Sequence, residues 1–158
     1  MILKTPSVIT LSGKGGVGKS TSLVGLINYF ISKKYNVYKL NYINKAYSAP
    51  EKTLVTTMLS ESEDYLVYVE ISDNVKCGIS TAGDYELMVV NNLQVLRDAA
   101  GCSVFVTPTR SSGKTVTAAE AFAKEVSGSL LMINKLHYSC YTNLNLPEFL
   151  FNLIINCK

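Results

Sequence analysis

The chain has 158 residues, which is enough for one domain with a single hydrophobic core and too short for two. An apolar fraction of 47% with 17% charged residues excludes a disordered chain, and a net charge of +3 without basic runs gives little support for nucleic-acid binding by charge alone. No stretch approaches the roughly 20 apolar residues of a membrane span, and the N-terminus has too short an apolar run for a signal peptide. We therefore expect a cytoplasmic protein.

The first third of the chain predicts a strand, a helix and a second strand. Residues 7–12 (SVITLS) form a short β-branched run that ends in glycines, as a buried strand entering a turn does. From residue 19 to 33, apolar residues recur at the spacing of one buried helical face: Leu23, Leu26, Ile27, Phe30 and Ile31. Residues 36–42 (NVYKLNY) then predict a second strand.

The middle of the chain predicts a hairpin after a segment with little pattern. Within residues 44–64, Pro50 marks a break and residues 51–59 are compatible with a helix. Two strand-like runs follow, at residues 66–71 (LVYVEI) and 75–81 (VKCGIST). They are joined by turn-forming residues 72–74, so we expect an antiparallel hairpin there.

Helices and strands alternate again in the last part of the chain. The periodicity predicts helices over 85–100 and 116–126 and strands over 103–107 and 130–133. Asn145 and Glu148 resemble a capping box that would start a final helix. This order predicts an α/β fold with one domain over residues 1–158, in which a mainly parallel sheet with one β-hairpin carries helices on both faces, as in P-loop NTPases.

Cysteine and histidine offer little to a metal site. The four cysteines are far apart and form no C-x-x-C pair, and the chain has a single histidine, His137. We expect reduced, mostly buried thiols at Cys77, Cys102, Cys140 and Cys157.

A phosphate-binding motif lies between the first predicted strand and the first predicted helix. Gly13, four residues, then Gly18, Lys19 and Ser20 match G-x-x-x-x-G-K-[ST] in full. Glycines allow successive backbone N–H groups to point at an anion, and the N-terminus of the helix adds its dipole. Lys19 is expected to reach the β- and γ-phosphates, and the Ser20 hydroxyl to hold Mg²⁺.

The loop itself is more specific than the general motif. Residues 14–21 read KGGVGKST, which resembles the deviant Walker A motif of the ParA and MinD type partition and division-site ATPases. The resemblance covers about the first 40 residues well. It implies an ATP-dependent switch in which Lys14 reaches across a nucleotide-bound homodimer to the partner's phosphates. The residues expected to contact the nucleotide are Gly13, Lys14, Gly15, Gly16, Val17, Gly18, Lys19, Ser20 and Thr21.

The second strand departs from that family. Its members usually carry an aspartate at the end of this strand that activates the attacking water, whereas Asn41 and Asn44 stand here. An amide cannot accept the proton of water and is a weaker magnesium ligand than a carboxylate. Impaired hydrolysis is therefore expected.

Polar residues just after the other strands are further candidates, because ligands of open α/β sheets bind outside the carboxyl ends of the strands. Asp84 is the first choice for the acidic group linked to Mg²⁺, with Glu70 and Asp73 as alternatives, although an aspartate before residue 85 also suits a helix N-cap. Arg110 follows a strand and has three interpretations: an internal arginine finger, a clamp for an acceptor, or a solvated loop residue.

Two weaker motifs follow. Gly113, Lys114 and Thr115 look like a second Walker A ending, but Pro108 stands where the first glycine is required, so we reject a second phosphate loop. Asn134 in LLMINKLH matches the position of a base-reading asparagine in related NTPases. His137 replaces the aspartate of a guanine-reading N-K-x-D motif, which favours adenine; a plain loop after a strand is the simpler interpretation.

Three functions agree with these features. The first is a Mg-ATP-dependent dimer switch acting on a protein or DNA partner, and the second is a small kinase that uses residues 44–64 and the hairpin to bind an acceptor. The third is a subunit that binds ATP and scarcely hydrolyses it. All three require ATP bound by Lys19.

Overall fold

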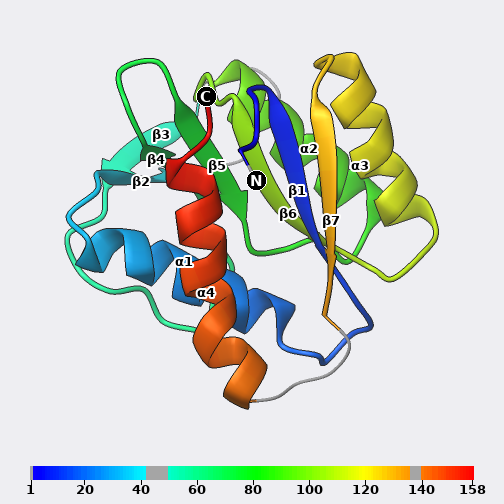
Figure 1. Ribbon diagram of the computed structural model, residues 1–158, viewed down its shortest axis with the longest axis horizontal. Helices are drawn as coiled ribbons and strands as arrows, with labels where there is room; N and C mark the ends of the chain where they lie inside the picture. Colours follow the sequence, from blue (N-terminus) through cyan, green and yellow to red (C-terminus); the bar gives the residue numbers. More distant parts are fainter. Residues whose placement is uncertain (1, 42–49, 136–139) are drawn as a thin grey trace.

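The computed structural model describes residues 2–41, 50–135 and 140–158, and these form a seven-stranded sheet flanked by four helices (Figure 1). In chain order the elements are β1 (Ser7–Ser12), α1 (Lys19–Ser32), β2 (Val37–Asn41), β3 (Glu51–Leu54), β4 (Leu66–Glu70), β5 (Lys76–Ser80), α2 (Glu86–Asp98), β6 (Val104–Thr109), α3 (Lys114–Glu125), β7 (Ser129–Asn134) and α4 (Cys140–Ile155).

The sheet is mixed but rich in parallel strands. Its order is β3-β2-β4-β5-β6-β1-β7. β1 pairs in parallel with β6 and β7, and β5 pairs in parallel with β6, whereas β4 is antiparallel to both β5 and β2, and β3 is antiparallel to β2. β1, β2, β5, β6 and β7 therefore run in one direction and β3 and β4 in the other. The predicted α/β class and the antiparallel hairpin of β4 and β5 are confirmed.

The core has two halves, one on each face of the sheet. Because side chains alternate along a strand, Val8 of β1 packs with α2 and α3 on one face, whereas Ile9 and Leu11 pack with α1 and α4 on the other. Phe30 in one half and Phe105 in the other are the largest of the fully buried side chains. The helices thus cover both faces, as the alternation of elements predicted.

Two of the expected elements differ from the structure. Residues 51–54 form the strand β3 and not the start of a helix over 51–59, because β3 is held by antiparallel pairing with β2, in which Tyr38 lies opposite Leu54. The last helix begins at Cys140, so the predicted capping box at Asn145 is wrong: an N-cap residue needs a non-helical backbone, and Asn145 lies within the helix. The other element ends agree with the predictions within two residues.

The two edges of the sheet are chemically unlike. β3 forms one edge, is exposed at all four residues, and carries Glu51 and Lys52. β7 forms the other edge, pairs only with β1 among the described strands, and contains no charged residue in Ser129–Asn134. Within the described part of the chain, no helix is both long and apolar enough to cross a membrane.

Candidate functional site

The strands that share one direction bring several predicted site residues to one end of the sheet, where the carboxyl ends of these strands lie. The carboxyl ends of β1, β5, β6 and β7 lead into the loop at Gly13, into Thr81, into Arg110 and into Lys135. The register pairs Ser12 with Thr109 of β6 and with Asn134 of β7, so these strands end at the same level. The candidate site lies at this carboxyl end of the sheet, at the turn between β1 and α1.

The loop between β1 and α1 needs its glycines. Gly16 and Gly18 have φ angles of 81° and 87°, in the left-handed region that other residues rarely adopt, and Gly18 is the N-cap of α1. At Gly13 a Cβ atom would lie 2.4 Å from the Lys135 carbonyl oxygen, so a side chain cannot fit there. Lys14, Gly15 and Gly16 are exposed, so the outer side of the loop is open to a ligand.

Lys19 lies beneath this loop with its ammonium group bonded to backbone. Its side chain is buried, with 8% of the residue exposed, and Nζ donates hydrogen bonds to the carbonyl oxygens of Gly13 at 2.5 Å and Thr109 at 2.7 Å. Burial lowers the pKa of Lys19, the Arg110 guanidinium lowers it further, and the Asp84 carboxylate raises it. Arg110 and Asp84 are therefore both close enough to act electrostatically on the ammonium group.

The floor of the site is built from hydroxyl groups. The buried hydroxyls of Ser12 and Thr109 lie 2.8 Å apart, and Thr10 Oγ1 lies 3.5 Å from Ser12 Oγ. These three residues come from two neighbouring parallel strands, so the contacts fix the level at which the loop leaves the sheet.

Ser20, in the first turn of α1, is linked to the end of β5. Its exposed hydroxyl donates to the Thr81 carbonyl oxygen at 2.9 Å. The Thr81 hydroxyl in turn donates to the carboxylate of Asp64 at 3.1 Å and accepts from the Tyr65 N–H at 2.8 Å. Asp64 was not among the predicted site residues. The predicted hairpin could have indicated it, because antiparallel pairing of the two strands places the residues before Leu66 beside Thr81.

Asp84 and Arg110 meet above the loop. Arg110 Nη2 lies 3.5 Å from Asp84 Oδ1, and the two side chains are 44% and 61% exposed. Arg110 Nη1 lies 2.7 Å from the position that a Cβ atom of Gly15 would take, so the guanidinium rests against the glycine loop between β1 and α1. The N-cap of α2 is Tyr85, which excludes the alternative role of Asp84 as N-cap of this helix.

Other predicted candidates lie elsewhere. Glu70 is paired with Lys76 at the opposite end of the strands, and Asp73 lies in the turn beyond this pair. Neither residue is therefore placed to act at the loop. Asn41 ends β2, four strands from β1, which is roughly 19 Å at the usual strand spacing, and its amide donates to Thr53 Oγ1 at 3.2 Å. Asn44 and His137 lie outside the described residues.

The two weaker motifs also have places in the structure. Gly113 precedes α3, and the Thr115 hydroxyl accepts a hydrogen bond from the Arg110 N–H at 2.9 Å. Thr115 of this Gly-Lys-Thr sequence therefore anchors the backbone of Arg110. Asn134 is an exposed residue that ends β7, at the same end of the sheet as the loop.

The donors present fit a magnesium ion only together with a phosphate. Within the described residues, no group of three or more His, Cys, Asp or Glu side chains is arranged to hold a metal ion. The available oxygen donors are the Ser20 hydroxyl and the Asp64 carboxylate, which both bond to Thr81, and the carboxylate of Asp84, three residues after Thr81. Mg²⁺ commonly binds one or two carboxylates, keeps several waters and takes its other ligands from substrate phosphates, so this sparse set is compatible with it.

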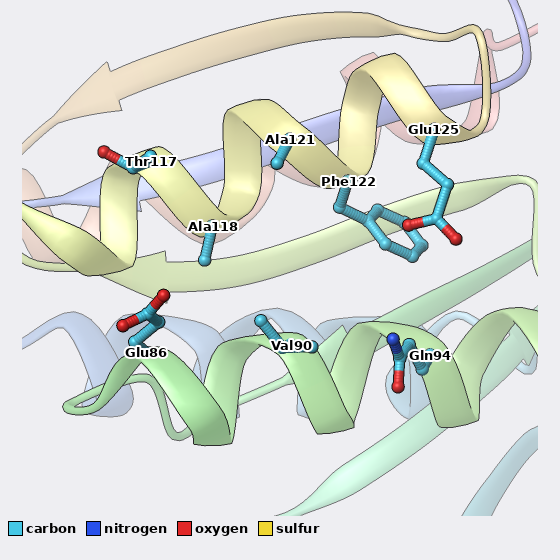
Figure 2. A pocket seen from close by; sticks show the side chains of 8 residues that line it. All are labelled: Glu86, Val90, Gln94, Thr117, Ala118, Ala121, Phe122 and Glu125. Carbon is cyan, nitrogen blue, oxygen red and sulfur yellow. The ribbon is translucent and has the colours of Figure 1, made fainter.

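A groove between α2 and α3 is a separate feature (Figure 2). It has a volume of about 230 Å³ and is lined by Glu86, Val90, Gln94, Thr117, Ala118, Ala121, Phe122 and Glu125. Carboxylates stand at both ends of this row of residues, and no basic side chain lines it. The groove is therefore unsuited to a phosphate, in contrast to the candidate site at the carboxyl end of the sheet.

Comparisons with protein-family models, with curated proteins and with solved structures find no match to this chain. The chemistry of the site is therefore inferred from the geometry of its own residues.

Proposed function

We propose that the chain is a P-loop nucleotide-binding domain that binds the triphosphate of ATP in the loop from Gly13 to Thr21. The observation that carries this proposal is the open glycine loop between a buried strand and a helix N-terminus, with the Lys19 ammonium held at its base. Backbone N–H groups, the helix dipole and Lys19 together favour a polyphosphate anion. Adenine is preferred over guanine because the guanine-reading motif is incomplete at residue 137.

Mg²⁺ is part of the proposed ligand, where it would neutralise phosphate charge. Ser20 would contribute a lone pair of its hydroxyl oxygen, whose proton is donated to the Thr81 carbonyl, and Asp84 or Asp64 would contribute a carboxylate. β5 itself ends in Ser80 and not in an acidic residue, so the carboxylates come from the segments beside it.

We further propose that ATP binding pairs two copies of the chain through Lys14. The supporting observations are the KGGVGKST sequence and the exposure of Lys14 on the open side of the loop. β2 ends in the amide residue Asn41, which lies far from the loop, so a slow ATPase with a switching role is favoured over a fast enzyme. A cytoplasmic location agrees with ATP as ligand and with the free thiols of Cys77, Cys102 and Cys157.

The test is the molar mass of the protein in light scattering, without nucleotide and then with Mg²⁺ and a non-hydrolysable ATP analogue. We expect a doubling of mass with the analogue. Lys19→Ala should abolish binding, measured separately by titration calorimetry, because the loop then lacks the ammonium group at its base. Lys14→Ala should retain binding but remain a monomer.

Lys124→Ala removes an exposed lysine at the end of α3 and serves as the control, with unchanged binding and pairing. Analogue binding that survives Lys19→Ala would refute the nucleotide site. Binding without a change of mass would refute the switch and direct attention to a kinase, whose ATP consumption would require an acceptor.

A further inference from the structure

The ion pair of Arg110 and Asp84 is placed to respond to a ligand. Its closest N–O distance is 3.5 Å and both side chains are substantially exposed, so water screens the pair and little free energy is lost when it opens. The backbone of Arg110 is fixed by its N–H bond to Thr115 Oγ1. The side chain can therefore change partner while its origin stays in place.

The Arg110 guanidinium also lies where a bound phosphate would be. It rests against Gly15 in the middle of the loop, and it adds to the effect of burial in lowering the pKa of the Lys19 ammonium. A fork of N–H donors suits phosphate oxygens, to which arginine can bind with two parallel hydrogen bonds. In the structure Asp84 is the carboxylate paired with this guanidinium, through one N–O contact of 3.5 Å.

Building on the proposed function, we propose that Arg110 is a phosphate ligand of this site and that Asp84 is its exchange partner. In the free chain Asp84 holds Arg110 at the loop. When a triphosphate binds, Arg110 transfers from Asp84 to phosphate oxygens, and the released carboxylate becomes available to the accompanying Mg²⁺. One exposed ion pair is thereby replaced by two contacts to the ligand, which couples the binding of the cation to that of the nucleotide.

This exchange predicts opposite effects for its two partners. Arg110→Gln removes a phosphate ligand and should weaken binding of the Mg²⁺-bound analogue by tenfold or more. Asp84→Asn removes the group that competes for Arg110, so it should strengthen binding of the analogue in EDTA several-fold. The same variant should gain less from Mg²⁺ than the unmodified protein does, because a carboxylate has been lost.

The experiment is titration calorimetry of the full chain with the non-hydrolysable ATP analogue, in EDTA and in Mg²⁺. The variants are Arg110→Gln, Arg110→Lys, Asp84→Asn and the double variant Arg110→Gln/Asp84→Asn. The other arginine–aspartate pair of the chain, Arg97 and Asp98 at the far end of α2, supplies controls with the same change of charge: Arg97→Gln and Asp98→Asn. Both controls should bind within twofold of the unmodified protein in either condition.

The double variant gives the decisive comparison. If Asp84 acts by holding Arg110, the gain from Asp84→Asn in EDTA disappears once Arg110 is absent; if Asp84 merely repels phosphate, the gain persists and the exchange is refuted. Binding of Arg110→Gln within twofold of the unmodified protein would also refute it. Circular dichroism checks that each variant folds, and Arg110→Lys, which keeps the charge but loses the fork, should bind with intermediate affinity.

Loss of binding in Lys19→Ala separates this inference from the proposed function. If the unmodified protein binds and Lys19→Ala does not, equal affinities across the Arg110 and Asp84 variants refute the exchange alone. If the unmodified protein does not bind the analogue, both proposals fail.

Discussion

The thiol of Cys102 illustrates how burial of one residue sets the response of the whole chain to alkali. Cys102 is 7% exposed, and desolvation raises its pKa from an ordinary 9.0 to about 12, although Lys76 and Lys52 act to lower it. Above pH 9 the unfolded chain releases this proton and the folded chain retains it. Because the folded state then binds more protons, stability falls as the pH rises from about 9 towards 12.

We expect Cys102 to reduce the free energy of unfolding by about 2 kcal/mol between pH 8 and pH 10.5. Urea unfolding of the unmodified protein and of Cys102→Ala at both pH values measures this, since the variant lacks the thiol and should lose correspondingly less. An equal loss in both proteins would show that Cys102 titrates in the folded state. The difference between the two proteins isolates the effect of this thiol, because every other residue is the same in both.

At the scale of residues, the sequence located the turn between β1 and α1, and it indicated Asp84 but not Asp64 among the carboxylates. Gly13, Gly18 and Lys19 were identified because their spacing follows from backbone geometry, which the chain needs locally. Asp64 was missed because its contact with Thr81 depends on strand pairing across 17 residues. The proximity of Arg110 to Gly15 likewise arises from the order of strands in the sheet, which no local pattern contains.

Among the elements, α4 depends on one of its two neighbouring phenylalanines. Phe151 is 7% exposed and packs against Tyr29, Phe30 and Tyr35 of α1 and the turn after it, with ring centroids 4.8 to 5.7 Å apart. Phe149, two residues earlier, is 51% exposed. One helix thus carries the same type of residue at a core position and at a surface position.

Phe151→Ala should lower the free energy of unfolding by about 3–5 kcal/mol, because it leaves a cavity between α4 and α1. Phe149→Ala should change it by less than about 0.5 kcal/mol. Urea unfolding of the two variants measures both values. Similar losses in the two variants would mean that α4 is not docked as described.

Element prediction succeeded where apolar periodicity was strong and failed where pairing decides. α1 was predicted from five apolar residues on one face, and its bounds agree within one residue. Residues 51–54 (EKTL) contain a single apolar residue, so their sequence has no strand period, and only the hydrogen bonds to β2 make them a strand. The orientation of β4 against β2 is similarly a property of the sheet and not of either segment.

For the whole molecule, β1 joins the two halves of the core to the site. Val8 belongs to one half and Ile9 to the other, and the strand continues directly into the glycine loop before α1. Both halves should therefore unfold together, and a ligand at the loop should stabilise both. The chain contains no tryptophan, so calorimetry is the suitable measurement.

At a concentration of Mg²⁺-ATP analogue 100 times its Kd, the free energy of unfolding should rise by about 2.7 kcal/mol. For a chain of this length the midpoint of thermal unfolding should rise by about 5–10 °C. Differential scanning calorimetry should show a single transition that shifts as a unit, and Lys19→Ala should show no shift. A second transition that stays in place would indicate that one half of the core is independent of the site.

The unlike edges of the sheet limit how copies of the chain can associate side by side. An open-ended fibre built by strand addition needs two receptive edges on every copy, one to join the copy before and one to join the copy after. Here the β3 edge presents Glu51 and Lys52, which oppose pairing, and only the β7 edge is free of charge. Pairing through the β7 edge alone joins only two copies of the chain. The difference between the two edges therefore protects the chain against polymerisation through its own sheet.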